Sequence, residues 1–160
     1  MVNPGTVDAP ELVRRLAELH KITLTVTVGR DERLRSTIEA IRASSERQFQ
    51  IIGWTDQMPR LLLESHLLIG KAGGATVQET IAARCPMIVN QIVPGQEEGN
   101  ARLIVETGSG IVITSPAEVA IAAENAFAND ARQWHEWAEK ISLLSRPAAA
   151  LEIARFLLSL

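Results

Sequence analysis

The chain has 160 residues, of which 46% are hydrophobic and 22% charged, and a formal net charge of −3. These values predict one globular domain large enough to bury a core. The negative charge gives no basic footprint for nucleic acid. No apolar run reaches the roughly 18 residues that span a membrane, and no signal-peptide pattern opens the chain.

The single cysteine, Cys85, excludes an internal disulfide and a cysteine-rich zinc site. It lies in an apolar stretch, so we expect a buried small hydrophobe rather than a reactive thiol. This cysteine usage, without a targeting segment, favours a reducing, cytoplasmic location.

The first half of the chain alternates helical and extended patterns. Residues 7–20 predict a helix, because apolar residues recur at helical spacing after the candidate N-cap Asp8. The elements predicted next are a β-branched strand at 22–28, an amphipathic helix at 31–43, an extended segment at 48–52 and, after the loop at 53–56, a short helix at 58–64.

The stretch Gly70–Asn100 carries the strongest functional signal. Leu67–Ile69 predicts a buried strand that ends at Gly70, and Gly73-Gly74 allows a tight turn into a helix. Met87–Val89 predicts the next buried strand. The second half continues with helices at 97–107 and 116–127, a short strand at 110–113, and two closing helices at 129–145 and 147–160.

This alternation predicts an α/β fold with a mainly parallel, Rossmann-like sheet flanked by helices. Such a sheet opens with a strand, and here only Met1-Val2 could remain of one. We therefore expect residues 1–160 to form a single domain whose first strand is missing, cut from a longer protein.

A glycine turn that leads into a helix offers unpaired N–H groups and a positive dipole end, which suit a phosphate or diphosphate. The Walker lysine pattern and the GxGxxG fingerprint are absent, so from spacing alone a plain structural turn is equally open. The polar loop Pro94–Asn100 follows the neighbouring strand and favours a site, because ligands of open α/β sheets bind at the carboxyl ends of strands.

Thr76 and Glu79 have the spacing of a capping box, so Glu79 has a structural reading as well as a functional one. We read Lys71 as a solvated side chain, and His66 as structural because no acid or cysteine constellation accompanies it. The apolar stripe of residues 151–160 predicts a final helix docked onto the domain.

The run KAGGATVQETIAARCPMIVNQIVPGQEEGNA resembles the C-terminal, nucleotide-sugar-binding half of the family 28 glycosyltransferases. Within them it is most similar to the monogalactosyldiacylglycerol synthase and diacylglycerol glucosyltransferase group. Gly53-Trp54 with Met58, and Arg146-Pro147 before the last helix, also resemble that group, so the likeness covers residues 20–160. It implies the GT-B plan, in which two Rossmann-like halves face each other and the C-terminal half holds a UDP-sugar.

The resemblance assigns residues to each part of the donor. It places the diphosphate at Gly73, Gly74, Ala75 and Thr76, the ribose at Glu79, the uracil at Gly53, Trp54, Thr55 and Met58, and the sugar at Gln96, Glu97 and Asn100. It implies no metal and no cofactor, because helix dipole and backbone donors would stabilise the leaving UDP. No catalytic residue is assigned, since the base would belong to the missing N-terminal domain.

These expectations describe the donor half of a transferase that moves a hexose from UDP to a diacylglycerol-like acceptor. The complete enzyme would lie at the cytoplasmic face of a membrane, and this domain alone would bind UDP-sugar without turnover. Three alternatives stay open: a stand-alone donor subunit with a separate acceptor-side partner, half of a UDP-sugar epimerase, and a nucleotide-binding module without chemistry. Neither the hexose nor the acceptor follows from the residues.

Overall fold

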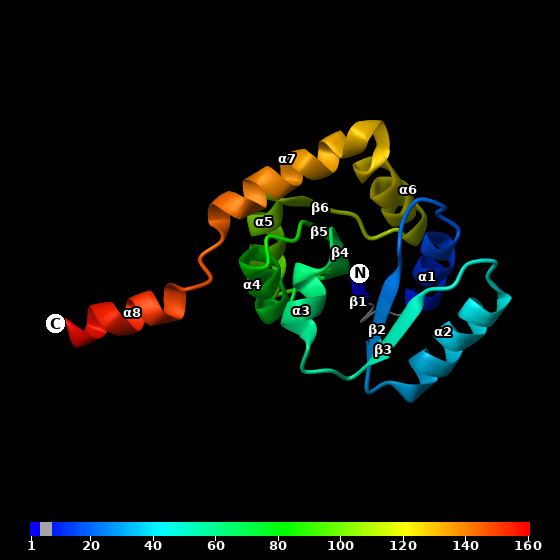
Figure 1. Ribbon diagram of the computed structural model, residues 1–160, viewed down its shortest axis with the longest axis horizontal. Coiled ribbons are helices and arrows are strands. Elements are labelled where there is room, and N and C mark those ends of the chain that lie inside the picture. Colours follow the sequence, from blue (N-terminus) through cyan, green and yellow to red (C-terminus); the bar gives the residue numbers. More distant parts are fainter. Residues whose placement is uncertain (4–7) are drawn as a thin grey trace.

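The computed structural model describes residues 1–3 and 8–160, which form alternating strands and helices (Figure 1). The strands are β1 (Val2–Asn3), β2 (Thr25–Gly29), β3 (Gln50–Gly53), β4 (Leu68–Lys71), β5 (Met87–Gln91) and β6 (Gly110–Val112). The helices are α1 (Ala9–Ala17), α2 (Glu32–Ser44), α3 (Met58–Leu63), α4 (Gly74–Ala82), α5 (Glu98–Glu106), α6 (Pro116–Ala126), α7 (Ala128–Leu144) and α8 (Ala149–Leu158).

The six described strands form one parallel sheet in the order β3-β2-β1-β4-β5-β6. The order reverses between β1 and β4, which is the point where doubly wound sheets open a crevice at their carboxyl ends. Strand β6 approaches β5 closely at Gly110, where an added methyl group would overlap the Met87 carbonyl oxygen. The predicted α/β fold and parallel sheet are confirmed.

The expectation of a missing first strand is wrong, because a two-residue strand occupies the central position. Val2 of β1 lies opposite Val26 of β2 on one side and Ile69 of β4 on the other. The backbone hydrogen bonds between β1 and β4 extend one residue further toward the N-terminus, since the Ile69 N–H donates to the Met1 carbonyl at 2.9 Å. Two residues suffice because both neighbouring strands supply backbone partners.

Two hydrophobic clusters cover the two faces of the sheet. Along β5, Ile88 belongs to the cluster under α1, α2 and α6, whereas Met87 and Val89 belong to the cluster under α3, α4 and α5. Helix α7 contributes to both, with Trp137 in the first and Ile141 in the second.

The two closing helices differ from their prediction. Near the start of α7, Asn129, Asp130 and Ala131 all have positive φ, so regular helix starts only at Arg132. Helix α8 extends away from the domain (Figure 1) and has no buried residue. Its apolar stripe is therefore exposed, and the predicted docking onto this domain is wrong.

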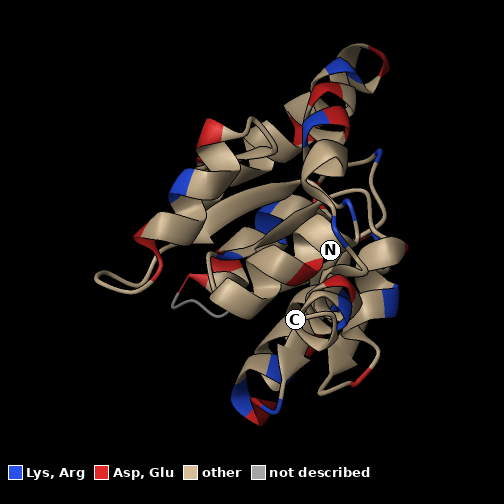
Figure 2. Cartoon of the chain, turned by 90° about the vertical axis from the view of Figure 1, so that its left-hand side faces the viewer, with Lys and Arg blue, Asp and Glu red and all other residues tan. Residues whose placement is uncertain are grey.

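Charged residues of both signs are spread over the helices and loops (Figure 2). The strands carry almost none: the only charged residue in the described strands is Lys71, the last residue of β4. A charge at the end of a buried strand requires a partner, and this one lies in the candidate site.

Candidate functional site

The candidate site lies at the carboxyl edge of the sheet, where the parallel strands all end together. The loops after β2, β3, β4 and β5 meet this edge, and helices α2, α3, α4 and α5 begin from it. The predicted phosphate turn and the predicted sugar loop follow β4 and β5, which are neighbours in the sheet. The fold therefore brings these two loops together, as expected.

The phosphate turn leads directly into α4. Gly73 is the N-cap residue, and its carbonyl accepts the first helical bond from the Val77 N–H at 2.9 Å. No side chain caps this helix within the described chain, and Gly74 and Ala75 are exposed. The amide N–H groups of residues 74–76 thus have no helical partner and point out of the helix start, an arrangement that suits an anion.

The capping-box reading of Thr76 and Glu79 is wrong. Because α4 begins at Gly74, Thr76 is the third residue of the helix rather than its cap. Its carbonyl accepts the hydroxyl of Thr80 at 2.5 Å. Glu79 is exposed on the surface of α4, so its carboxylate does not serve the helix start. Its predicted role toward a ribose stays a prediction.

Glu97 ties the second loop to the first. One carboxylate oxygen accepts from the Lys71 ammonium at 2.7 Å, and the other accepts from the Val93 N–H at 2.9 Å. The side chain is 7% exposed, whereas that of Lys71 is 44% exposed. The hydrogen bond from Lys71 is the main reason that the pKa of Glu97 is lowered. Lys71 is therefore an ion-pair partner, and its reading as a solvated lysine is wrong.

Asn100 makes a second tie between the loops. Its side-chain amide donates to the carbonyl of Ala72 at 2.9 Å, immediately before the glycine turn. Of the three predicted sugar-contacting residues, Glu97 and Asn100 are thus engaged within the chain, whereas Gln96 is exposed. The Lys71–Glu97 and Asn100–Ala72 hydrogen bonds therefore hold the two loops together.

The predicted uracil loop lies further along the same edge. Trp54 is 64% exposed and stacks under the Arg30 guanidinium, 4.8 Å from the ring centre. Thr55 accepts the Gln57 N–H at 3.0 Å, and Met58 opens α3. Strand β3 lies three strand spacings from β4, about 14 Å. Trp54 is therefore a surface residue and not part of the core.

Sequence reasoning missed several residues at this edge: Lys71 as a partner of Glu97, Arg30 beside Trp54, and Asn90 and Gln91, whose side-chain oxygens are buried. The sequence could have indicated a partner for Lys71, because this lysine is the one charged residue in a run that predicts a buried strand. The contact of Arg30 with Trp54 depends on the pairing of β2 with β3, which the sequence does not give.

Other chemistry-bearing residues lie away from this edge or are inert. Cys85 is 2% exposed, and burial raises the pKa of its thiol to about 11, so it stays protonated near neutral pH. His66 precedes β4 at the opposite edge, with its ring 5.4 Å from that of Trp134. Among residues 1–3 and 8–160 no cluster of three His, Cys, Asp or Glu could hold a metal.

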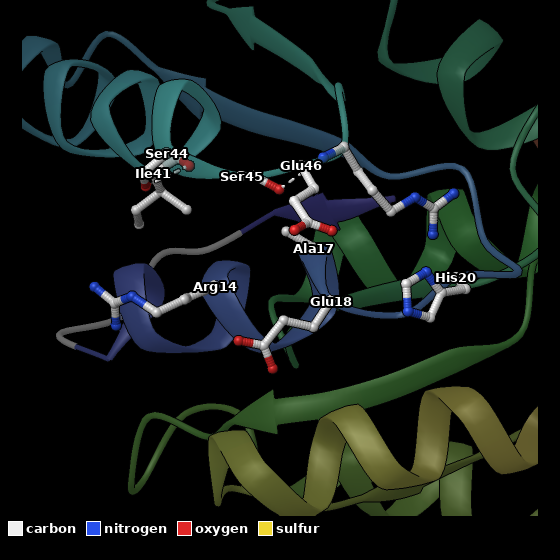
Figure 3. Close-up of a pocket in the computed structure, with 9 residues that line it drawn as sticks. Arg14, Ala17, Glu18, His20, Ile41, Ser44, Ser45 and Glu46 are labelled. Atoms are coloured by element: carbon white, nitrogen blue, oxygen red, sulfur yellow. Dashed lines mark hydrogen bonds between the residues drawn. The ribbon is translucent and has the colours of Figure 1, made fainter.

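A pocket of about 370 Å³ lies between the C-terminal ends of α1 and α2, at the amino edge of the sheet (Figure 3). Its two arginines have partners within the chain, whereas its two carboxylates, Glu18 and Glu46, are exposed. Arg14 pairs with Glu11 at 2.5 Å, and the Arg47 guanidinium donates to the Leu19 and Ile22 carbonyls. Among the described residues, no side-chain polar atom of this lining is both buried and without a hydrogen-bond partner, so nothing here calls for a ligand.

No helix in the described part of the chain is long and apolar enough to cross a bilayer.

Comparison with curated proteins finds lipid glycosyltransferases. The chain is 32% identical over 134 residues to monogalactosyldiacylglycerol synthase 3 of Arabidopsis thaliana, a match that covers 82% of this chain and 28% of that protein. It is 26% identical over 123 residues to the processive diacylglycerol beta-glucosyltransferase of Bacillus subtilis, covering 77% and 32% of the two chains. The chain therefore spans about a third or less of these relatives' length.

Solved structures confirm the fold. MurG of Acinetobacter baumannii superposes with a TM-score of 0.75 at 19% identity, over 100% of this chain and 49% of that one. UDP-GlcNAc 2-epimerase of Neisseria meningitidis, solved with UDP-GlcNAc, gives a TM-score of 0.73 at 13% identity, over 99% of this chain and 43% of that one. The fold is thus the Rossmann-like half of the GT-B plan, which transferases and epimerases share.

Residues 7–121 match the glycosyltransferase family 28 C-terminal domain. Because this match covers more than half of the chain, the chain belongs to the glycosyltransferase family 28 C-terminal domain family, and it is homologous to lipid glycosyltransferases.

Proposed function

We propose that this chain holds the UDP-hexose donor of a glycosyltransferase whose acceptor is a diacylglycerol-like lipid. One observation carries the proposal: the uncapped N-terminus of α4 lies where two polar loops are tied together at the carboxyl edge. Free N–H groups and the helix dipole at this point favour a diphosphate. The names of the curated relatives support a lipid acceptor.

In this proposal the donor lies along the carboxyl edge. The diphosphate binds the N–H groups of Gly73–Thr76, and the Glu79 carboxylate accepts from the ribose hydroxyls. The uracil lies about 14 Å away at the loop of Gly53, Trp54, Thr55 and Met58. This separation along the edge suits an extended nucleotide.

The hexose lies beside the second loop. Gln96 is exposed and contacts the sugar directly. Glu97 and Asn100 already make hydrogen bonds within the chain, to Lys71 and Val93 and to Ala72 respectively, and they contact the sugar through their remaining donors and acceptors. As the bond to the sugar breaks, the helix N-terminus stabilises the charge that develops on the leaving UDP. This step requires no cofactor or metal.

The base that deprotonates the acceptor hydroxyl belongs to an N-terminal domain of the same chain or of a partner chain. The complete enzyme works at the cytoplasmic face, peripheral to the membrane. The chain by itself therefore binds UDP and UDP-hexose without transferring sugar. A donor subunit with a separate acceptor-side partner is the second form of the same proposal.

An epimerase half is the rival, because UDP-GlcNAc 2-epimerases share the fold. That likeness lies below 20% identity and concerns the fold alone, whereas the curated relatives with higher identity are transferases. Conversion of a UDP-sugar without any lipid acceptor would favour the epimerase.

Calorimetric titration with UDP, UDP-glucose, UDP-galactose and ADP tests the proposal, with Gly74→Ala as the central variant. An added methyl at Gly74 has its nearest neighbour, the Asn100 amide nitrogen, at 3.7 Å, so the fold accepts it. We expect Gly74→Ala to keep or raise stability, by up to about 1 kcal/mol, and to weaken UDP binding at least about tenfold by blocking the close approach of phosphate.

Glu79→Ala should also weaken the binding of uridine nucleotides. Gln78 is the exposed neighbour of Glu79 on the same helix, so Gln78→Ala serves as the matched control. Tight ADP binding, unchanged UDP binding by folded Gly74→Ala, or transfer of hexose by the 160 residues alone would each contradict part of the proposal.

A further inference from the structure

Lys71 lies where the two loops of the candidate site meet. It is the last residue of β4, and within the described residues its ammonium makes one hydrogen bond, to Glu97 at 2.7 Å. An ammonium carries three N–H donors, so two of them are left over. The side chain is 44% exposed, and a ligand at this edge of the sheet can therefore reach it.

The ammonium also lies beside the start of α4. A methyl group added at Gly73, the N-cap residue of this helix, would lie 3.7 Å from the Cε atom of Lys71. It would lie 3.7 Å from the Oε1 atom of Glu97 and 3.6 Å from the Oγ1 atom of Thr76. Three polar side chains thus converge on the side of the turn that Gly73 leaves open, and the ammonium nitrogen, bonded to Cε, is one of them.

The charges at this point are balanced only when an anion is bound. The N-terminal end of a helix carries partial positive charge, which repels a cation such as Lys71. Glu97 offsets part of this repulsion, but a diphosphate at the turn would in turn be repelled by its nearly buried carboxylate. The Lys71 ammonium contacts that carboxylate and borders the turn, so it is placed to attract both anions.

The order of the strands indicates which phosphate Lys71 meets. Strands β3 and β5 lie on opposite sides of β4. The proposed uracil loop follows β3, whereas Lys71 pairs with Glu97 in the loop after β5. A nucleotide that extends along the edge from the uracil loop therefore brings its α-phosphate to the turn first, and its β-phosphate lies on the side of Lys71.

We propose that Lys71 bridges Glu97 and the β-phosphate of the donor, with one N–H donated to the carboxylate and another to a phosphate oxygen. The inference rests on the proposed function and deepens it, because it assigns to Lys71 the selection of a nucleoside diphosphate over a monophosphate. One cation then serves the phosphate turn and the sugar loop together.

Calorimetric titration of Lys71→Met with UDP and with UMP tests the bridge. We expect UDP binding to weaken about tenfold, because a charge-assisted hydrogen bond is lost, and UMP binding to change little. Lys21 is exposed and precedes β2 at the amino edge of the sheet, so Lys21→Met is a control with the same change of charge. An equal loss for UDP and UMP would mean that Lys71 only supports the turn, and would overturn the proposal.

Glu97→Gln gives a result of opposite sign. The amide has a single oxygen, so it cannot replace both the bond from Lys71 and the bond from the Val93 N–H. The variant removes the negative charge beside the phosphate and keeps the ammonium. We expect UDP to bind about threefold more tightly, although the variant loses the same ion pair as Lys71→Met. Unchanged or weaker UDP binding by folded Glu97→Gln would contradict the bridge.

Inorganic pyrophosphate separates this inference from the proposed function. The sequence has three lysines, so ¹³C-labelled lysine gives one NMR probe in the site and two controls, Lys21 and Lys140. We expect pyrophosphate and UDP to shift the Cε signal of Lys71 alone. Binding of UDP without that shift would overturn only the bridge. A Lys71 shift with pyrophosphate, but no binding of uridine nucleotides, would overturn only the proposed donor. Absence of both would overturn the two proposals together.

Discussion

At the scale of single residues, two helices of this domain end in the same way with different residues. After α4 the Cys85 N–H donates to the Thr80 carbonyl and the Arg84 N–H to that of Ile81; after α5 Ser109 and Gly108 make the corresponding bonds. These are Schellman motifs, which place one residue at positive φ. That residue is Gly108 after α5 (φ 67°) and Arg84 after α4 (φ 57°).

This pair yields a matched prediction about stability. The left-handed conformation costs a non-glycine residue about 1 kcal/mol, so Arg84→Gly should raise the free energy of unfolding by up to about that amount. The reciprocal change Gly108→Arg should lower it by a similar amount. Urea denaturation of both variants measures the difference, and destabilisation by Arg84→Gly would show that the Arg84 side chain contributes more than its strained backbone costs.

The residue scale is also where sequence reasoning met its limits. The glycine turn and the polar loop could be predicted, because glycines and the strand-helix alternation are local signals. The partners of Lys71 and Asn100 could not, since they depend on how β4 and β5 pair across 26 and 28 residues. The capping-box prediction was wrong because Thr76 and Glu79 have the right spacing, but the helix begins two residues before Thr76, at Gly74.

At the scale of elements, the Lys71–Glu97 pair joins the end of β4 to the loop before α5. Glu97→Gln removes the charge of a nearly buried partner and should lower stability by about 1 kcal/mol near neutral pH. The value is modest because Lys71 is 44% exposed and solvent screens the pair. A double-mutant cycle with Lys71→Met isolates the coupling between the two side chains.

The same pair predicts how stability depends on pH. The pKa of Glu97 is lowered in the folded protein, chiefly by the hydrogen bond from Lys71, relative to about 4.3 in the unfolded chain. Its contribution is therefore complete above the unfolded pKa and is lost as pH falls through the folded one. Melting curves of wild type and Glu97→Gln should differ at pH 6, and the difference should shrink progressively as the pH falls below the unfolded pKa of about 4.3. A difference that persists in acid would show that the pair's charge is not its source.

At the scale of the whole molecule, the parallel sheet could be predicted from the chain, but its strand order and its central strand could not. Alternating patterns at 22–28, 67–69 and 87–89 predict parallel strands, whereas a two-residue strand such as Val2–Asn3 has no pattern of its own. It is recognisable only because both neighbours pair with it. Likewise, an apolar stripe predicts that a helix face will be covered, without indicating what covers it.

Helix α8, with its apolar stripe, shows that limit. Its large apolar side chains are exposed, Phe156 by 63% and Leu157 by 60%. The chain is held to the domain one turn earlier, where the Ser145 hydroxyl donates to the Ala82 carbonyl at 3.2 Å. Removing residues 147–160 should therefore leave the melting temperature unchanged and reduce self-association, because an exposed apolar face is lost.

Helix α7 supplies the contrasting control, since Trp137 is 6% exposed in the core. Trp137→Ala should lower the free energy of unfolding by about 3 kcal/mol or more, whereas Phe156→Ala should change it little. Thermal melts and light scattering of the three variants compare the two helices directly. If the truncated chain melts at a lower temperature, α8 packs against this domain in solution as its sequence pattern alone predicts. If it melts as the full chain does, the domain folds independently of α8, and the apolar face of that helix contributes to association rather than to folding.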